Sequence, residues 1–410
     1  MNQVALIHYS CPPVIGGVEF VIQGQARVMA SHGHQVKLIV GTGGRLPEAV
    51  VEIIPEIGSR HGHVAEINEA LLGGEIPDGF YPLKATIAAK VKAALKGVKV
   101  CLIHNVMTMP FNLGLTAALS DIIDELGGHI RFYLWCHDAA LIDPNYEIPR
   151  PKEYPWHLLG RAHPGAQYVM ISKLRRRQIC TLLGIPEQDA LVVPNGLDMK
   201  ALLGISDRLW QLALEKGFLE DDLVMLFPSR ILRRKNYELG IQIVRALKDQ
   251  GKKAKLLITA PPDPHAHETV RYFKELHDLC QDLDVQSDVL FLYDLRHPYF
   301  PEGKVSFGDL RNLYALCDLL LVTSREEGFG LPLLEAGAFK LPIACANIEP
   351  LGEVAGAHAL YFDLNEQPTR IAEKIWQLYS SFPTSAMFKR VIFNFSWEAI
   401  YRDYLKNIVR

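Results

Sequence analysis

The sequence predicts two α/β domains, each built on a parallel sheet that helices cover on both faces. Three observations indicate this. At 410 residues, the chain is too long for one ordinary hydrophobic core. Short apolar runs alternate with longer helical patterns throughout, which is typical of strand-helix-strand units. The alternation starts again after a Pro-Asn-Gly turn near the middle of the chain.

Ten segments are predicted as strands. The first half contains residues 4–8, 35–40, 98–104, 130–136 and 167–171, and the second half contains residues 224–227, 255–259, 289–293, 319–323 and 342–346. The turn at Val193-Pro-Asn-Gly-Leu-Asp198 is the expected join between the two domains. Ligands of doubly wound sheets bind beyond the carboxyl ends of the strands, so two such domains facing each other would enclose a cleft.

Composition excludes several classes of protein. The chain is 49% hydrophobic and 22% charged with a formal net charge of -3, which does not suit a general nucleic-acid binder. Its seven cysteines are scattered without a Cys-x-x-Cys pair, so we expect a reduced, cytoplasmic protein. No apolar run reaches the length of a membrane span, and Met1 leads directly into a strand. We therefore expect at most peripheral membrane contact, and the oligomeric state stays open.

The segment Glu327-Gly-Phe-Gly-Leu-Pro-Leu-Leu-Glu335 is the most informative motif, because it follows a predicted buried strand and opens a helix. Gly328 and Gly330 are expected to adopt positive φ and let the backbone approach a ligand, and Pro332 suits the first helical position. The free N–H groups of that turn favour an anion. Both carboxylates would face one pocket and accept hydrogen bonds from sugar hydroxyls. A capped surface helix is the alternative, but it leaves both glycines without a role.

Two cations follow the strand at residues 224–227. Arg230 and Lys235 are placed at a strand-to-helix turn, where they can clamp a diphosphate, while Arg233 and Arg234 are expected to point elsewhere. A merely basic helix start near Asn236 is disfavoured, because positive charge there opposes the helix dipole unless an anion binds.

A glycine pair follows the first predicted strand and precedes a helix over about residues 18–32. Gly16 and Gly17 can bring backbone N–H groups close to a phosphate or a sugar. The segment is not a dinucleotide-binding fingerprint, because the Gly-x-Gly-x-x-Gly spacing is absent. The alternative is that Gly16 and Gly17 serve only the geometry of the turn. We interpret Gly41-Thr-Gly-Gly44 in this second way.

Histidine ends two of the predicted strands. His137-Asp138 follows residues 130–136, and His104-Asn105 closes the strand at residues 98–104. An imidazole at this edge could hydrogen-bond a sugar hydroxyl and stabilise charge at a reacting carbon. A structural histidine is the equally weighted alternative for His137, and the functional interpretation is weaker for His104.

No catalytic metal and no permanently bound cofactor are expected. Asp263-Pro-His265-Ala-His267 is a proline-rich loop without a fourth ligand in reach, and Asp282-Leu-Asp284 is interpreted as a solvated turn between a helix and a strand.

In their order and spacing these motifs resemble the retaining glycosyltransferases of family 4, which have the GT-B architecture of two doubly wound Rossmann-like domains facing across a cleft. The resemblance covers almost the whole chain. It rests on Gly16-Gly17-Val-Glu19, His32-Gly-His-Gln-Val36, His137, Val193-Pro-Asn-Gly-Leu-Asp198, Arg230 with Lys235, Glu327 to Glu335, and Gly352-Glu353-Val.

The resemblance implies roles for the donor site. Glu335 would bind the nucleotide ribose, Glu327 would lie by the transferred sugar, and Arg230 with Lys235 would hold the diphosphate. It further implies that His137 lies beside the reacting sugar. The backbone of the segment Gly328-Phe329-Gly330-Leu331 would approach sugar and phosphates, and Gly16 and Gly17 would join the donor site. Asp138 is assigned to the acceptor.

The resemblance also implies that the two domains bind different substrates. The C-terminal helix, beginning near Ser396, would cross back to the first domain, so residues 1–195 plus 396–410 would bind the acceptor and residues 196–395 the donor. The donor would be a UDP- or GDP-sugar. Tyr293, His297-Pro-Tyr-Phe-Pro301 and Asn347-Ile-Glu-Pro350 depart from the family pattern, which leaves the base and the sugar open.

The predicted activity is transfer of a hexose, most simply glucose or mannose, to a hydroxyl of a small-molecule, glycan or lipid-linked acceptor, with no nucleic-acid partner. Three alternatives stay open: a glycoside hydrolase using Glu327 and Glu335, a non-catalytic sugar-nucleotide binding module, and a sugar-nucleotide epimerase. Within the first domain, Arg60-His-Gly-His63 and Lys173-Leu-Arg-Arg-Arg177 could hold a phosphate or carboxylate of the acceptor, or form a solvated surface.

Overall fold

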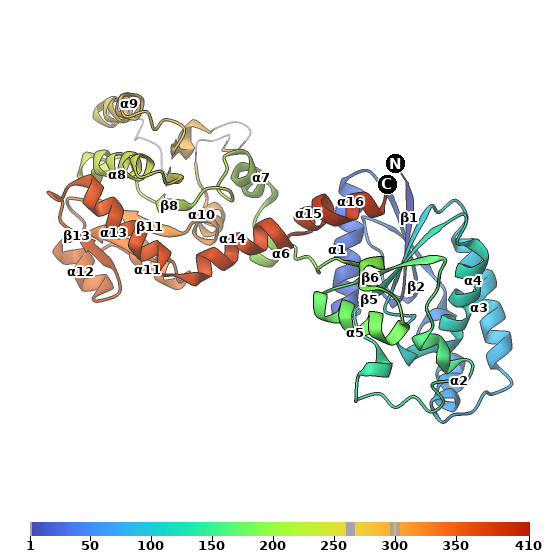
Figure 1. The fold of residues 1–410 in the computed structure, drawn as a ribbon. Helices are drawn as coiled ribbons and strands as arrows, with labels where there is room; N and C mark the ends of the chain where they lie inside the picture. The colour runs from blue at the N-terminus through green and yellow to red at the C-terminus, as the bar shows by residue number, and fades with distance from the viewer. Residues whose placement is uncertain (1, 260–266, 296–298, 301–303) are drawn as a thin grey trace. The chain divides into compact units, whose positions relative to one another are not determined.

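The computed structural model describes residues 2–259, 267–295, 299–300 and 304–410. The chain divides into two compact units, and each is described here by itself. Unit 1 contains the residues up to Asp198 together with Phe393–Arg410, and unit 2 contains Met199–Ile392. Each unit holds one parallel sheet between two layers of helices, as the sequence predicts (Figure 1).

The sheet of unit 1 has seven parallel strands in the order β3-β2-β1-β4-β5-β6-β7. The five predicted strands are all present. β3 and β7 were not predicted, because each is short and lies at an edge of the sheet where burial is incomplete. The strand bounds are β1 Gln3–Ser10, β2 Gln35–Thr42, β3 Val50–Ile53, β4 Val100–His104, β5 Arg131–Cys136, β6 Ala166–Met170 and β7 Ala190–Val192.

Alternate residues of the strands face different helices. Leu6 and Leu38 pack toward α1 and the end of the chain, while Ile7 and Ile39 pack toward α2, α3 and α4. This two-sided burial explains why the strands are apolar throughout rather than alternating with polar residues. The helices are α1 Gly17–Ser31, α2 Gly62–Leu72, α3 Phe80–Ala94, α4 Leu113–Leu126 and α5 Lys173–Leu183.

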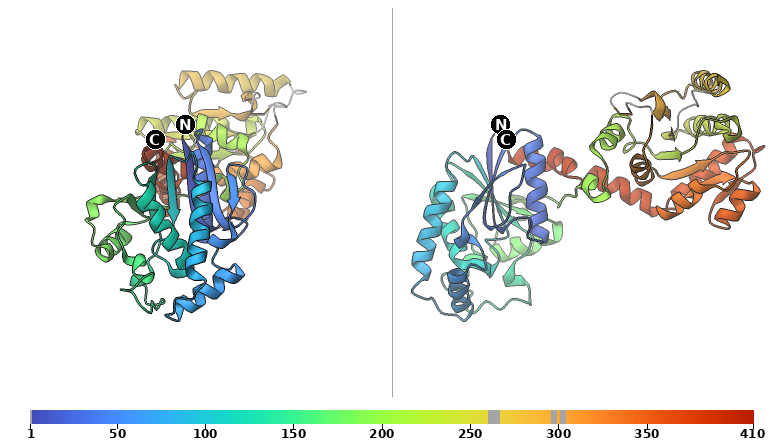
Figure 2. Two further views of the ribbon diagram at one scale, coloured as in Figure 1. Left: turned by 90° about the vertical axis from the view of Figure 1, so that its right-hand side faces the viewer. Right: turned by 180° about the vertical axis from the view of Figure 1, so that it is seen from behind.

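The end of the chain packs against unit 1, which confirms the predicted crossing back. Ser396 accepts a hydrogen bond from the amide of Ala399 and caps α15 (Trp397–Ile400), which a π turn joins to α16 (Lys406–Ile408). The Trp397 indole fills space that only glycine leaves open, because a Cβ on Gly24 would lie 1.9 Å from its Nε1. The C-terminal segment, red, therefore lies beside the blue α1 in Figure 1 and in the right view of Figure 2.

The sheet of unit 2 has six parallel strands in the order β10-β9-β8-β11-β12-β13. Again the five predicted strands are present, and the short edge strand β13 was not predicted. The bounds are β8 Leu223–Phe227, β9 Ala254–Ile258, β10 Val289–Phe291, β11 Leu319–Val322, β12 Ile343–Ala346 and β13 Leu360–Phe362.

Helices cover both faces of this second sheet. α8, α9 and α13 share one apolar core with it, and α7, α10, α11 and α12 share the other. The helices are α6 Met199–Leu203, α7 Asp207–Glu215, α8 Tyr237–Asp249, α9 His267–Asp282, α10 Phe307–Leu316, α11 Leu331–Ala338, α12 Glu349–Ala355, α13 Pro368–Ser380 and α14 Pro383–Phe395. None of the helices within the described ranges is both long and apolar enough to cross a membrane.

Candidate functional site

Two neighbouring strands of unit 2 bring the predicted donor residues together. β8 pairs with β11, so the loops after them meet at the carboxyl edge of the sheet. Thr323, directly after β11, donates hydrogen bonds to the carbonyl oxygens of Lys235 at 3.1 Å and Asn236 at 2.8 Å. Asn236 adopts a left-handed φ of 54° and accepts a hydrogen bond from Arg325 Nη2 at 3.0 Å. The loop that carries Lys235 is therefore held in one conformation.

Lys235 and Glu327 form a nearly buried ion pair at this edge. Lys235 Nζ donates a hydrogen bond to Glu327 Oε1, and the two side chains are 10% and 12% exposed. Ser324 Oγ donates to the same carboxylate oxygen at 2.7 Å. Such a desolvated, hydrogen-bonded pair fixes the positions of both side chains.

The two arginines between the predicted cations behave differently from each other. Arg233 points away as expected, pairing with Glu275 at 2.6 Å and lying over the Tyr272 ring. For Arg234 the expectation was wrong. Its Nη1 lies 3.6 Å from Glu327 Oε2 and donates to the Glu326 carbonyl at 2.9 Å, so it adds a second cation to the Glu327 carboxylate.

Arg230 is exposed and forms no ion pair with any residue that the structure describes. Its backbone is nevertheless fixed. The Tyr237 hydroxyl donates to the carbonyl oxygens of Ser229 at 2.8 Å and Arg230 at 3.0 Å. A guanidinium on an anchored backbone, without an anionic partner among the described residues, is available to bind an anionic ligand.

The glycine-rich turn matches the prediction at one glycine only. Gly330 caps α11 with a φ of +104°, and a Cβ there would lie 2.8 Å from Leu351 Cδ2, so two separate constraints favour glycine. Gly328 does not adopt positive φ, and a Cβ on it would meet no atom within 4 Å. Pro332 is the second helical residue rather than the first. Gly328 is thus compatible with close ligand approach but is not required by backbone geometry.

Glu335 has a different partner from Glu327. The Tyr314 hydroxyl on α10 donates a hydrogen bond to Glu335 Oε2 at 2.7 Å. Tyr314 is buried and stacks on Phe339 with 5.4 Å between ring centroids. Burial, and then the Glu335 carboxylate, raise the pKa of the Tyr314 hydroxyl, so it remains a donor at all ordinary pH values.

The absence of a catalytic metal stays a prediction. Over the ranges that the structure describes, no three His, Cys, Asp or Glu side chains are grouped so as to hold a metal ion. Asp282 is the last residue of α9, and Asp284 pairs with Lys248 at 3.3 Å, which suits a solvated turn. Asp263, His265 and the His267 side chain lie outside the described residues.

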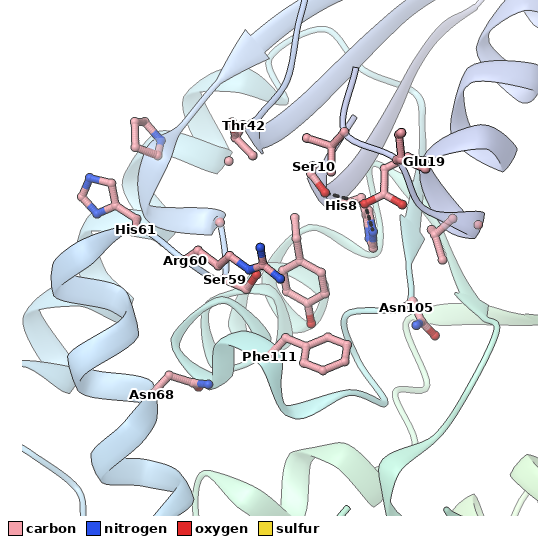
Figure 3. Close-up of a pocket in the computed structure, with 18 residues that line it drawn as sticks. His8, Ser10, Glu19, Thr42, Ser59, Arg60, His61, Asn68, Asn105 and Phe111 are labelled. Atoms are coloured by element: carbon pink, nitrogen blue, oxygen red, sulfur yellow. Dashed lines mark hydrogen bonds and ion pairs between the residues drawn. The ribbon is translucent and has the colours of Figure 1, made fainter. Parts of the chain in front are cut away.

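Unit 1 contains a cavity of about 880 Å³ at the carboxyl edge of its sheet (Figure 3). The ends of β1 and β2, the start of α1 and the loop before α2 contribute most of its wall. The lining includes nine polar or charged side chains, namely His8, Ser10, Glu19, Thr42, Ser59, Arg60, His61, Asn68 and Asn105. A volume of this size suits a small polar ligand.

Glu19 is held on one side of this cavity. Ser10 Oγ donates to Glu19 Oε1 at 2.5 Å, and His8 Nε2 lies 3.8 Å from the same oxygen. A Cβ on Gly16 would lie 2.0 Å from Glu19 Oε2, so glycine at this position leaves room for the carboxylate. Gly17 lines the cavity, and a Cβ there would meet nothing within 4 Å.

Three histidines form a buried chain behind the cavity. His8 Nδ1 donates to the His104 carbonyl at 2.8 Å, and His104 Nδ1 lies 3.3 Å from His137 Nε2. Burial lowers the pKa of all three, and burial followed by the neighbouring His8 lowers the pKa of His137 to about 3. His137 therefore carries a neutral imidazole at physiological pH.

Neither His137 nor Asp138 lines this cavity. Asn105, at a left-handed φ of 53°, accepts the backbone N–H groups of both residues at 3.2 and 3.0 Å and so fixes the turn after β5. Asp138 itself pairs with Arg175 Nη2 at 2.7 Å. Arg175 belongs to the basic run after Ser172, so at least part of that run has a structural partner within unit 1.

Sequence reasoning missed four side chains that support the candidate sites, namely Ser324, Arg234, Tyr314 and Ser10. Ser324 and Arg234 had an available signal, because they adjoin the motifs of Glu327 and Lys235. Tyr314 and Ser10 had none. Tyr314 reaches Glu335 from another helix, and Ser10 contacts Glu19 only because the turn after β1 reverses the chain.

Two family models match most of the chain. The model described as Glycosyltransferase Family 4 matches residues 15–201, and the model described as Glycosyl transferases group 1 matches residues 213–391. Their boundary falls close to the division between the two units at Asp198 and Met199.

Curated relatives and solved structures are similar over most of their length. Mannosylglucosylglycerate synthase of Thermotoga maritima is 24% identical over 371 residues, which are 85% of this chain and 81% of that protein. The enzyme of the same name from Petrotoga mobilis is 26% identical over 62% of each chain. The crystal structure of Anabaena HepE in complex with UDP-glucose aligns with 100% of this chain and 99% of its own, at 17% identity and a TM-score of 0.37.

Proposed function

The chain belongs to the glycosyltransferases described as family 4 and group 1, and on this premise we propose that it transfers a hexose from a nucleoside-diphosphate sugar to a hydroxyl acceptor with retention of configuration. The observation that carries the proposal is the Lys235–Glu327 pair at the carboxyl edge of β8 and β11. A fixed cation beside a fixed acceptor of hydrogen bonds suits a ligand that joins a diphosphate to a sugar.

Most of the proposed donor contacts belong to unit 2. Arg230 and Lys235 would hold the diphosphate, with the backbone of Gly328–Leu331 and the first turn of α11 close to its oxygens. Glu327 would accept hydrogen bonds from the transferred sugar, and Glu335, oriented by the Tyr314 hydroxyl, would accept those of the ribose. The donor would be a UDP- or GDP-sugar, and no permanently bound cofactor takes part.

The acceptor would bind to unit 1, with its hydroxyls toward Glu19. In the transfer, the bond between the anomeric carbon and the diphosphate oxygen breaks, and a bond to the acceptor oxygen forms on the same face. The acceptor proton passes to the departing diphosphate oxygen, so no protein base is required. Lys235 and Arg230 stabilise the charge on the leaving group, which supplies most of the acceleration.

His137 would contribute as a neutral hydrogen-bonding group beside the reacting sugar, since its pKa of about 3 excludes an imidazolium. Glycine at positions 16 and 17 would admit the donor close to the backbone. Asp138 remains our candidate for an acceptor contact, although Arg175 already binds one of its carboxylate oxygens.

The hexose is proposed to be mannose or glucose. The two relatives named above are synthases of a mannosylglucosylglycerate, so mannose is the first sugar to test. A glycoside hydrolase fits less well, because it gives Arg230 and Lys235 no role and because two cationic side chains already contact the Glu327 carboxylate. An epimerase or a non-catalytic binding module would bind the same donors, and product analysis separates both from a transferase.

A two-step experiment tests the proposal on the full-length protein. Thermal-shift measurements with UDP-, GDP- and ADP-sugars identify the donor by the rise in melting temperature. The best donor is then incubated with a mixture of hydroxyl acceptors, and mass spectrometry detects a mass gain of one hexose. Retention is read from the anomeric proton coupling of the product. Donor epimerisation without transfer, or binding without turnover over all acceptors, would reject the proposed activity.

A further inference from the structure

Arg60 projects into the unit 1 cavity from a loop that the structure holds firmly. The loop follows the 3-10 turn Pro55–Ile57 and leads into α2. The carbonyl oxygens of Glu56 and Gly58 accept hydrogen bonds from Asn112 Nδ2 at 2.9 and 3.2 Å. Gly58 also packs against Gly41, where a Cβ would lie 2.2 Å from Gly58 Cα. Arg60 therefore starts from a fixed position at the cavity wall.

The Arg60 side chain is exposed and lines the cavity. Its guanidinium has no anionic partner among the residues that the structure describes. In Figure 3 it extends from the side of His61 and Ser59 toward the middle of the space, whereas Glu19 lies with Ser10 on the other side. Arg60 and Glu19 are the two formally charged side chains in the lining apart from histidine. Ser10, which donates to Glu19, is neutral, so Arg60 and Glu19 supply opposite charges on opposite sides of the cavity.

We propose that this cavity binds an acceptor that carries a carboxylate or phosphate group, with Arg60 binding the anion and Glu19 binding a hydroxyl of the same molecule. The inference rests on the proposed function for the role of acceptor, but the recognition itself needs only unit 1. A planar guanidinium binds a carboxylate or phosphate through two parallel hydrogen bonds, and a carboxylate binds hydroxyls. An asymmetric cavity with one group of each kind fixes both ends of a small anionic polyol.

The cavity limits the size and kind of this acceptor. A space of about 880 Å³ suits a mono- or disaccharide derivative rather than a polymer segment. The ring of Phe111 and the Tyr9 ring lie 5.7 Å apart by their centroids and supply an apolar wall against which a sugar can pack. The first turn of α2, which follows Arg60, contains no acidic side chain that would repel the anion.

Matched pairs of probes test the anion separately from the sugar. The probes are glucosylglycerate with neutral glucosylglycerol, and fructose 6-phosphate with fructose. Titration calorimetry on the full-length protein, with the nucleoside diphosphate present at saturation, gives the ratio of affinities within each pair. We expect at least one anionic probe to bind 10-fold or more tightly than its neutral partner. The glycerate arm and the phosphate arm distinguish the two sources of the anion.

Substitution of Arg60 should remove this preference. In Arg60→Gln the ratio within the responding pair should fall to about one, and Arg60→Lys should restore part of it, because the charge returns without the planar fork. Arg131→Gln, which removes an exposed arginine at the start of β5 outside the cavity, should keep the wild-type ratio. Ratios of one in wild type for both pairs, or an unchanged ratio in Arg60→Gln, would overturn the inference.

The result also separates this inference from the transferase activity. Hexose transfer only to neutral acceptors, with no anion preference, would leave the proposed function standing and reject the role of Arg60. Binding of an anionic probe that depends on Arg60, without transfer to any acceptor, would do the reverse.

Discussion

Lys235 and Glu327 lie 92 positions apart in the sequence, yet Lys235 Nζ donates a hydrogen bond to the Glu327 carboxylate where β8 and β11 end side by side. Both side chains are almost fully buried, so each group depends on the other for compensation of its charge. A diphosphate arriving at this edge would meet a cation that is already desolvated and oriented. Preorganisation of this kind gives one charged contact a large effect on a transition state.

Lys235→Ala should therefore lower kcat/KM for the donor by about 2 to 4 kcal/mol of transition-state stabilisation. It should also reduce the free energy of unfolding by about 1 to 3 kcal/mol, because Glu327 loses its main partner while keeping Ser324. Steady-state kinetics and chemical denaturation measure the two effects separately. Unchanged turnover in a folded variant would remove Lys235 from the diphosphate site.

Lys255→Ala is the matched control for this prediction. Lys255 pairs with Asp221 at 3.1 Å in the same unit, with exposures of 12% and 15%, but it lies outside the candidate donor site. It should show a similar loss of stability with turnover close to that of the wild type. If both lysine variants lose activity equally, the effect of Lys235→Ala reflects folding rather than chemistry.

The sequence was sufficient to predict the fold class and ten of the strands, because buried parallel strands and amphipathic helices have distinct periods. It did not predict β3, β7 and β13, whose short edge positions leave little apolar signal. Proximity to a strand end predicted Lys235 and Glu327 as site residues. Their pairing depends on β8 lying beside β11, and that of Tyr314 with Glu335 depends on how α10 packs near α11, which no local pattern encodes.

The buried His137 should make unit 1 sensitive to acid. The unfolded chain protonates this histidine below about pH 6.5, whereas the folded protein does so only near its lowered pKa of about 3. Between these values the unfolded state binds more protons, so the free energy of unfolding falls as the pH falls, by about 1.4 kcal/mol per pH unit from this group. Above pH 6.5 the group contributes nothing.

His137→Gln removes this titration and should make the pH dependence of stability between pH 6 and 4 shallower, while His8 and His104, whose pKa values burial also lowers, keep their contribution. Denaturation followed by tryptophan fluorescence at a series of pH values gives the slopes, since Trp135 lies in the neighbouring core of unit 1. His129→Gln, at an exposed histidine, is the control and should keep the wild-type slope. Equal slopes in wild type and His137→Gln would show that His137 is already charged in the folded protein.

Gly16 should be needed for the position of Glu19. A Cβ at residue 16 would lie 2.0 Å from Glu19 Oε2, so Gly16→Ala should displace the carboxylate and break its bond with Ser10. We expect the KM of the acceptor to rise by about 5- to 20-fold, the scale of 1 to 2 kcal/mol for one hydrogen bond. Gly128→Ala, where a Cβ meets no atom within 4 Å, should change neither kinetics nor stability. If Gly16→Ala has the same acceptor KM as the wild type, Glu19 does not take part in acceptor binding.

Turnover should persist in excess EDTA. Arg230 and Lys235 are the groups proposed to neutralise the leaving diphosphate, and they would take the role that a divalent cation has in metal-dependent phosphate chemistry. The measurement is the initial rate of product formation with and without chelator, followed by addition of Mg²⁺ or Mn²⁺. Complete loss of the rate on chelation, restored by either metal, would contradict this prediction.

Substitutions of the two glutamates in the glycine-rich segment should have different effects, one on nucleotide binding and the other on turnover. Glu335, oriented by the Tyr314 hydroxyl at 2.7 Å, is proposed to accept hydrogen bonds from the ribose. Glu335→Ala should therefore weaken binding of the free nucleoside diphosphate by about 1.5 to 3 kcal/mol, the scale of hydrogen bonds to a charged group. Tyr314→Phe keeps the carboxylate but loses its orientation, so it should weaken the same binding less.

Glu327→Ala should behave in the opposite way. Since Glu327 is proposed to contact the transferred sugar, its loss should leave affinity for the free diphosphate nearly normal, or raise it, because Lys235 is released from its pair. Turnover should be lost along with the preference for the sugar nucleotide over the diphosphate. Titration calorimetry of all three variants with the nucleoside diphosphate and with the intact donor decides between the roles. Equal weakening of diphosphate binding in Glu335→Ala and Glu327→Ala, or weakening only in Glu327→Ala, would mean that the two carboxylates have been assigned to the wrong ends of the donor.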